Sequence, residues 1–300
     1  MINRPKRDLI EVFGYAPDDL TSQCRSLWNL SACTFTNKQC TKTNHDGSIV
    51  YGTCSVSSPF GDCVICPKRL YENNYATLRT ISKEVFGDLP VYMYEEFIPL
   101  REKLDNCVIA LGQNSGKEVK IGASLSMDWV LARLESHKLV EYTGVEVQSI
   151  DISGNYRDAW HSYRNMNAQT TSVTSSEHGM NWANVHKRLI PQIIRKGTIY
   201  AKSDLVKSGL YFVVPDIVYR KFEEILGADI PLLNSGGKDV LTIHTYELSP
   251  FLRHGEQRTL LLKRNIRFSL DEFSKRFISG PNLPSGLQLD NAVKRILGLA

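Results

Sequence analysis

The sequence has no long hydrophobic run. No uninterrupted apolar stretch approaches the roughly 18–20 residues that a transmembrane helix needs, so we expect no membrane-spanning segment. The first residues, MINRPKRDLIEVF, carry charges with no apolar segment behind them, which is not the pattern of a signal peptide. These two absences predict a protein that works in the cytoplasm.

Several common catalytic signatures are also missing. The sequence contains no GxGxxG, HExxH or GxSxG motif, and its seven histidines show no ligand spacing. Residues 112–118 are similar to a nucleotide-binding P-loop, but they have three residues between the glycines instead of four. Glu118 also stands where a P-loop needs Ser or Thr to bind magnesium. We therefore exclude a P-loop.

One stretch of the chain carries a marked excess of positive charge. The formal net charge is only +4, and residues 1–100 carry ten basic and eleven acidic residues. Residues 181–210 carry one acid, Asp204, and six basic residues: Lys187, Arg188, Arg195, Lys196, Lys202 and Lys207. Such a local surplus predicts a phosphate-binding surface, although a solvated helix has the same composition.

Cysteine is abundant in one segment. Five of the seven cysteines follow the pattern Cys33-x6-Cys40-x13-Cys54-x8-Cys63-x2-Cys66. An odd total without a signal peptide argues against a disulfide framework, whereas clustered thiolates suit a tetrahedral metal ion. By spacing alone, Cys63 and Cys66 are the pair best suited to bind one metal ion together. A tetrahedral ion needs four ligands, so one of the five cysteines would not be a ligand. Buried free cysteines and a redox CxxC remain the alternatives.

The alternation of hydrophobic segments predicts a mixed α/β (α+β) chain. We expect helices at 70–86, 94–104, 156–163, 181–196 (interrupted at Pro191), 215–226 and 289–297. We expect strands at 107–111, 127–134, 140–150, 210–214, 240–248 and 260–268, and a hairpin turn at 45–47. The cysteine-rich composition before residue 70 predicts an N-terminal metal-binding module at 1–70 and a second domain at 71–300.

Acidic residues stand on two of the predicted strands. Asp128 lies in an apolar strand, where an acid is costly unless it is paired or binds a metal. On the following strand, period-two alternation puts Glu146 and Gln148 on one face and the neighbouring valines on the other. Two such strands can bring two carboxylates to one magnesium ion, with Glu118 as a third candidate. This is the D…(D/E)xK layout of metal-dependent phosphodiesterases with Gln148 in place of lysine, but two acids on a hairpin also occur by chance.

Longer segments resemble one family. The segments are TFTNKQC, YGTCSV, VICPKRL, SMDWVLARL, YTGVEVQSIDISGNYRDAW and NWANVHKRLIPQIIRKG. They resemble the NotI family of type II restriction endonucleases, and most of all its EagI-like members, from about Arg7 through the GPNLP segment at 280–284. The resemblance implies a PD-(D/E)xK-type nuclease core, with a mixed central sheet flanked by helices, and a small N-terminal four-cysteine metal module.

The resemblance also implies an activity and partners. It implies a homodimer that cuts double-stranded DNA with Mg²⁺ at a GC-rich palindrome, CGGCCG, leaving 5′ overhangs. A cognate DNA methyltransferase would be its functional companion, with no direct contact. The alternative is a DNA-binding regulator that a metal stabilises and that has no catalytic activity. Cleavage of plasmid DNA separates the two hypotheses.

The resemblance assigns roles to the acidic cluster. The acid pair of the family falls on Asp128 and Glu146, its glutamine on Gln148, and its upstream glutamate on Glu118. The acids would hold magnesium, and Gln148 would orient the attacking water or a phosphate oxygen. Because Gln148 carries no charge, we expect this site to depend more on the metal than a site with lysine.

The resemblance also selects among the cysteines. It implies that four thiolates hold a structural iron or zinc ion, and these are Cys33, Cys40, Cys54 and Cys66. Cys63 has no counterpart, so the resemblance overrules the pairing that spacing alone favours. Basic residues are the natural readers of guanine in GC-rich DNA, and the candidates for DNA contacts are Lys68, Arg69, Lys187 and Arg188. Lys68 departs from the asparagine expected at its position.

Overall fold

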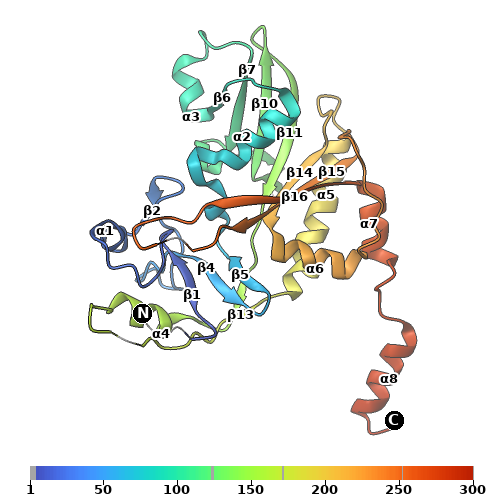
Figure 1. The fold of residues 1–300 in the computed structure, drawn as a ribbon. Coiled ribbons are helices and arrows are strands. Elements are labelled where there is room, and N and C mark those ends of the chain that lie inside the picture. The colour runs from blue at the N-terminus through green and yellow to red at the C-terminus, as the bar shows by residue number, and fades with distance from the viewer. Residues whose placement is uncertain (1–4, 123–124, 171, 252, 300) are drawn as a thin grey trace.

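A seven-stranded mixed sheet forms the centre of the computed structural model, which describes residues 5–122, 125–170, 172–251 and 253–299. The strand order is β16-β15-β14-β11-β10-β7-β6 (Figure 1). The bounds are β6 (Val91–Met93), β7 (Cys107–Gly112), β10 (Trp129–Glu135), β11 (Lys138–Val147), β14 (Leu210–Pro215), β15 (Val240–Leu248) and β16 (Leu260–Ser269). The pairs β6/β7, β11/β14 and β14/β15 are parallel, and the other neighbours are antiparallel.

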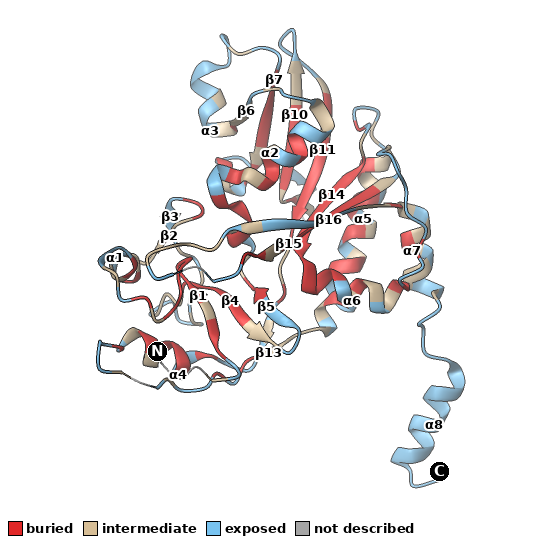
Figure 2. Ribbon diagram, in the orientation of Figure 1, coloured by how far each residue is buried: buried red, intermediate tan, exposed pale blue. Residues whose placement is uncertain are grey.

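Helices cover both faces of this sheet. On β14, Tyr211 and Val213 share a hydrophobic cluster with Leu78 of α2 (Glu72–Phe86). The alternate residue Phe212 packs on the opposite face. The helices there are α5 (Ile190–Ala201), α6 (Asp216–Leu226) and α7 (Leu270–Ser279). Because both faces are covered, β14 is buried along its whole length (Figure 2). The expectation of a mixed α/β fold with a central mixed sheet flanked by helices is confirmed.

The N-terminal region builds a smaller sheet. Its strands, in spatial order, are β1 (Leu9–Val12), β4 (Thr53–Ser58) and β5 (Gly61–Val64). Helix α1 (Ser22–Leu30) packs on α4 (Arg157–Arg164), with the rings of Trp28 and Trp160 centred 5.4 Å apart. One hydrophobic core therefore contains residues from both sides of position 70, and a domain boundary there stays a prediction.

The short elements of the chain complete the fold. They are β2 (Ala32–Cys33), β3 (Lys38–Gln39), a 3₁₀ turn (Pro67–Tyr71), α3 (Tyr94–Phe97), a 3₁₀ turn (Ile98–Leu100), a 3₁₀ turn (Gln113–Ser115), β8 (Val119–Ile121), β9 (Leu125–Met127), β12 (Ile152–Ser153) and β13 (Gly179–Met180). The expected hairpin turn at 45–47 is present between the bridged residues Thr43 and Val50. The expected helix at 94–104 is shorter, because Pro99 cannot donate a hydrogen bond in a continuing helix.

The expected interruption at Pro191 is absent. A π-helical turn (Val185–Leu189) leads directly into α5, and Pro191 lies in the first turn of that helix. Proline has no amide hydrogen to donate. It is tolerated here because it lies in the first turn of α5, where the hydrogen-bond pattern changes from that of the wider π-helical turn. The helical segment therefore extends past the expected end at residue 196, to residue 201.

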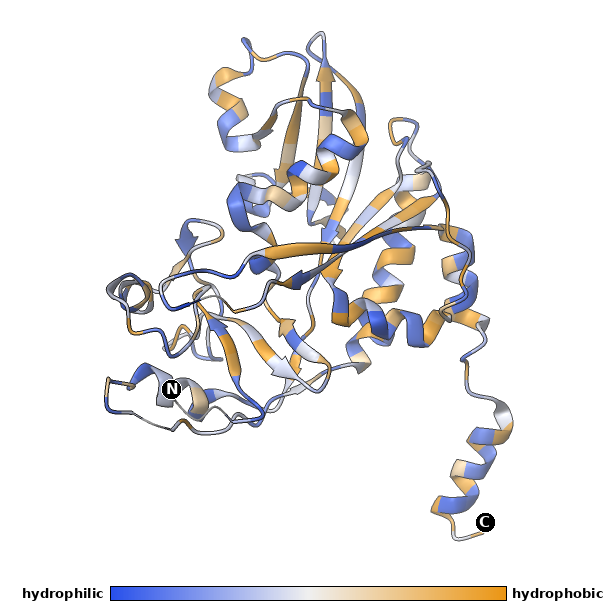
Figure 3. Cartoon of the chain, in the orientation of Figure 1, coloured by the Kyte–Doolittle hydropathy of each residue, from blue (hydrophilic) through white to orange (hydrophobic). Residues whose placement is uncertain are grey.

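Helix α8 (Gly286–Ile296) lies apart from the rest of the chain and is exposed on all sides (Figures 1 and 2). It is amphipathic, and its apolar residues are visible in Figure 3. None of the helices in the described part of the chain combines the length and hydrophobicity needed to cross a membrane.

Candidate active site and cysteine cavity

Asp128 occupies a bend between two sheets. β9, which pairs with β8, ends at Met127, and β10 of the central sheet begins at Trp129. The expected continuous strand at 127–134 is therefore broken at Asp128. The neighbouring strand β7 ends at Gly112, where a Cβ atom would lie 2.6 Å from the Asp128 carbonyl oxygen. A glycine at this position leaves room for the bend.

Three of the predicted site residues converge at this bend. The amide nitrogen of Asp128 lies 3.3 Å from Glu146 Oε1. Asp128 Oδ2 accepts hydrogen bonds from the amide of Val147 at 3.0 Å and from Gln148 Nε2 at 3.1 Å. Asp128 is half-buried, and Glu146 is buried. The structure therefore places Glu146 and Gln148 each in contact with Asp128.

Glu118 lies beside the same bend. β8 and β9 are antiparallel with Val119 opposite Met127, so the next position in this register puts Glu118 opposite Asp128. Its carboxylate forms an ion pair with Lys120 at 3.2 Å. The backbone thus brings a third acid to the edge of the cluster.

Helix α5 adds a residue that the sequence analysis counted among surface charges. Lys196 Nζ donates a hydrogen bond to Glu146 Oε2, and both side chains are less than 10% exposed. The available signal was the helical spacing of Ile193, Lys196 and Tyr200, which places the lysine on the buried face of α5. The basic stretch at 181–210 is therefore not a single solvated surface.

The carboxylates repel each other in a dry environment. Burial raises the pKa of Glu146 to about 8, the neighbouring charge of Asp128 adds to the increase, and the ammonium of Lys196 opposes it. An additional cation at this position would favour the charged form of both acids. The oxygen donors fit a hard divalent ion such as magnesium.

Tyr200 packs beside the ion pair. A Cβ atom on Gly144 would lie 2.1 Å from Cζ of the Tyr200 ring, so the ring occupies the space of a missing side chain. Gly144 and Glu146 are two apart on β11, and Tyr200 and Lys196 are four apart on α5. Both spacings keep residues on one face, so two matched contacts fix this helix on this strand.

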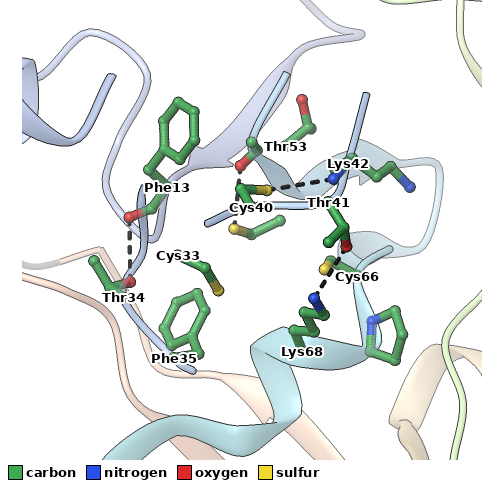
Figure 4. A pocket seen from close by; sticks show the side chains of 13 residues that line it. Phe13, Cys33, Thr34, Phe35, Cys40, Thr41, Lys42, Thr53, Cys66 and Lys68 are labelled. Atoms are coloured by element: carbon green, nitrogen blue, oxygen red, sulfur yellow. Dashed lines mark hydrogen bonds between the residues drawn. The ribbon is translucent and has the colours of Figure 1, made fainter. Parts of the chain in front are cut away.

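Four cysteines line one cavity. Cys33, Cys40, Cys54 and Cys66 surround a volume of about 120 Å³, with Lys68 at its wall (Figure 4). Burial raises the pKa of Cys54, and negative charge on Cys66 and Cys33 would raise it further. A metal cation would relieve this repulsion, so the donor set fits a thiolate-bound metal.

Cys63 does not line this cavity. It is fully buried in the main hydrophobic core, where its Sγ lies 3.7 Å from the carbonyl oxygen of Val64. Burial raises its pKa to about 12, which keeps the thiol protonated. The structure thus separates Cys63 from the other four cysteines of the segment.

Neither the acidic cluster nor the four cysteines form a complete metal-coordination geometry in the described structure. Within the ranges that the structure describes, no three His, Cys, Asp or Glu side chains are arranged to hold a metal ion. The backbone brings the members of each set together, and side-chain movements would be needed to complete a coordination sphere.

Arg69 differs from its expected position on a DNA-binding surface. It is fully buried and forms ion pairs with Glu11, at 3.1 Å, and with Glu72. Its guanidinium also lies 4.6 Å from the centre of the Phe35 ring. A guanidinium held in this way does not reach a guanine, so the interpretation of Arg69 as a DNA contact is wrong.

Of the other basic candidates, Lys187 and Arg188 are exposed and Lys68 is half-buried. Lys68 donates a hydrogen bond to Thr41 Oγ1 at 3.0 Å beside the cysteine cavity. Lys187 and Arg188 project from the π-helical turn, and Arg188 lies 3.4 Å from Asp151 Oδ2. Unlike Arg69, these three side chains reach the surface, where they can face a phosphate backbone.

One family model matches the chain. It is described as the restriction endonuclease NotI and matches residues 13–214, which is more than half of the chain. The match contains the four cysteines of the cavity, the acidic cluster and helix α5. No curated protein matches the chain significantly.

Proposed function

The chain belongs to the NotI family of restriction endonucleases, and we propose that it is a magnesium-dependent type II enzyme of the PD-(D/E)xK type. Its substrate would be double-stranded DNA with a GC-rich palindrome, CGGCCG, cut to leave 5′ overhangs. The observation that carries this proposal is the convergence of Asp128, Glu146 and Gln148 at one bend.

The reaction would be hydrolysis of a phosphodiester. A water oxygen bonds to phosphorus, an ester P–O bond breaks, the water loses a proton, and the leaving oxygen gains one. Asp128 and Glu146 would hold Mg²⁺, with Glu118 supporting a second ion. Bound magnesium stabilises negative charge on phosphate oxygens and acidifies water. Gln148 would turn its amide from Asp128 to the water or to a phosphate oxygen.

The cysteine cavity would have a structural role. We propose that Cys33, Cys40, Cys54 and Cys66 hold one iron or zinc ion. Four thiolates fill a tetrahedral sphere and leave no open position for substrate, so the ion would contribute folding free energy instead of catalysis. The supporting observation is that these four cysteines line one volume and Cys63 does not.

Recognition of a palindrome would require two copies. A twofold DNA site matches a homodimer in which each copy reads one half-site. The candidates for contacts with DNA are Lys187 and Arg188, which are exposed, and Lys68, which is half-buried. A cognate methyltransferase that modifies the same sequence would protect the host DNA without touching this chain.

A cleavage assay tests the proposal. Supercoiled plasmids with and without CGGCCG are incubated with the protein in Mg²⁺ or in EDTA, and the ends are sequenced. We expect cutting only of the plasmid that contains the site and only with Mg²⁺. Cutting of DNA without the site at ordinary salt would refute the target, and specific binding without cutting would favour a regulator.

A further inference from the structure

Helix α5 supplies a positive charge to a site whose motif lacks one. In the D…(D/E)xK layout, the last position carries a lysine, and this chain has the neutral Gln148 there. Lys196, which lies fifty positions beyond Glu146, places its ammonium on Glu146 Oε2. The cation therefore arrives from a helix outside the motif.

We propose that Lys196 is a positioning residue that takes over the charge role of the missing lysine. It holds the Glu146 carboxylate toward the Asp128 bend and offsets one of the negative charges that an approaching phosphate meets. This inference rests on the proposed nuclease function and extends it to a residue outside the acidic motif.

Burial explains why this charge matters. Lys196 and Glu146 are both nearly excluded from solvent, and a buried ion pair gives little net stability after its desolvation cost. A lysine in a helix position flanked by Ile193 and Tyr200 would pack as well with an apolar side chain. The electrostatic contribution to the site, where water does not screen it, is the remaining benefit.

Within the described part of the chain, Tyr200 places an unpartnered polar group beside the pair. Its hydroxyl is buried and has no hydrogen-bond partner among the residues that the structure describes. Burial raises its pKa well above the usual value, and the charge of Glu146 is the next cause. Helix α5 therefore presents to the site both the ammonium of Lys196 and the Tyr200 hydroxyl, which has no hydrogen-bond partner among the described residues.

The structure suggests moving the charge as a test. Gln148 Nε2 lies 3.1 Å from Asp128 Oδ2, so the long side chain of a lysine at 148 can bring a positive charge to the Asp128 carboxylate of the same acid pair. If charge is the role of Lys196, Gln148→Lys should compensate for Lys196→Met. A lysine that only fills space in the core cannot be replaced from another strand.

The experiment compares the wild type with Lys196→Met, Lys196→Arg, Gln148→Lys/Lys196→Met and the exposed control Lys83→Met on α2. Measurements are single-turnover cleavage with Mg²⁺, affinity for cognate DNA in EDTA, and thermal melting. We expect Lys196→Met to slow cleavage at least about 100-fold and to weaken metal-free DNA binding about 3–10-fold, because charge near the phosphate is lost. Lys196→Arg should retain part of both, the double variant should recover at least about tenfold in cleavage, and Lys83→Met should match the wild type.

Three outcomes would overturn the inference. One is wild-type cleavage by Lys196→Met. Another is a folded Lys196→Met whose loss of cleavage and binding is not reduced by Gln148→Lys. The third is a fall in melting temperature that is equal in Lys196→Met and in Gln148→Lys/Lys196→Met and is large enough to explain the loss of cleavage by unfolding. The proposed nuclease activity is judged separately, since it fails if the wild type cleaves no better than Asp128→Ala.

Discussion

The amide nitrogen of Asp128 lies 3.3 Å from a carboxylate oxygen of Glu146, and the amide of Val147 donates back to the Asp128 carboxylate at 3.0 Å. Each acid is thus held by the backbone next to the other. This reciprocal arrangement fixes two acidic side chains close together in a partly buried position, where ionising both is costly without a counter-ion. The fold maintains an arrangement that a divalent cation would stabilise.

Asp128→Ala and Glu146→Ala should each abolish cleavage and leave specific DNA binding largely intact or stronger. Removal of a metal ligand eliminates most of the catalytic effect of the cation, while loss of negative charge near the phosphate favours binding. Cleavage rates and gel-shift affinities measured side by side check this. Full cleavage by either variant would show that the acids are not ligands of the catalytic metal.

Local patterns predicted the acidic cluster better than the basic one. Alternation along β11 put Glu146 on the face opposite Val145 and Val147, and both valines do pack in the cluster with α2. Lys196 was missed because its contact spans fifty positions and depends on where α5 sits on the sheet. The pattern of residues within one helix or strand cannot predict a contact between two elements that lie so far apart in the sequence.

Charge in a sequence also does not show which side chains are exposed. Arg69 follows a cysteine-rich loop and looked like a DNA contact, but Glu11 from β1 and Glu72 from α2 enclose it. The short strands β8 and β9 were not predicted, since three residues carry too little alternation. The bend at Asp128 depends on these strands.

Substitution of each cavity cysteine by serine should remove the metal, whereas Cys63→Ser should keep it. Three remaining thiolates bind a metal far more weakly than four, and the lost binding free energy is lost folding free energy. Elemental analysis of purified variants, with melting curves, measures both effects, and we expect about one iron or zinc per wild-type chain. Metal loss in Cys63→Ser with retention in Cys33→Ser would invert the ligand assignment.

Gly144→Ala should destabilise the chain by about 2–4 kcal/mol, because the new methyl group collides with the buried ring of Tyr200. The matched control is Gly236→Ala, where a Cβ meets nothing within 4 Å. Urea unfolding of the two variants gives the difference. Equal stability of Gly144→Ala and the wild type would mean that α5 does not pack on β11 as described.

Acid should remove a stabilising contribution from Glu84 on α2. Burial opposes its ionisation, but hydrogen bonds from His244 and Arg267 outweigh burial and lower the pKa to about 2 from the ordinary value of 4.5. Since the folded-state pKa is the lower one, this stabilisation is complete above about pH 5 and is lost as the pH falls toward 2.

Glu84→Gln should therefore lower the free energy of unfolding by about 1–2 kcal/mol at pH 7, and the deficit should shrink below pH 4.5. Urea titrations from pH 7 to pH 3 follow it, with the exposed Glu102→Gln as the control. A deficit that stays constant over this range would show that the ion pairs of Glu84 do not contribute.

Neutralising Lys187 or Arg188 should weaken DNA binding without changing the sequence that is cut. Both side chains are exposed on the π-helical turn before α5, so contacts with phosphates would give affinity that is independent of sequence. Each lost contact should reduce the slope of log affinity against log salt by about 0.9, whereas Lys294→Gln on the separate helix α8 should leave it unchanged. Affinities of Lys187→Gln and Arg188→Gln between low and moderate salt measure the slopes, and sequencing of the cut ends shows the target. A changed cleavage sequence would make these residues base readers, since only contacts with base edges distinguish one site from another.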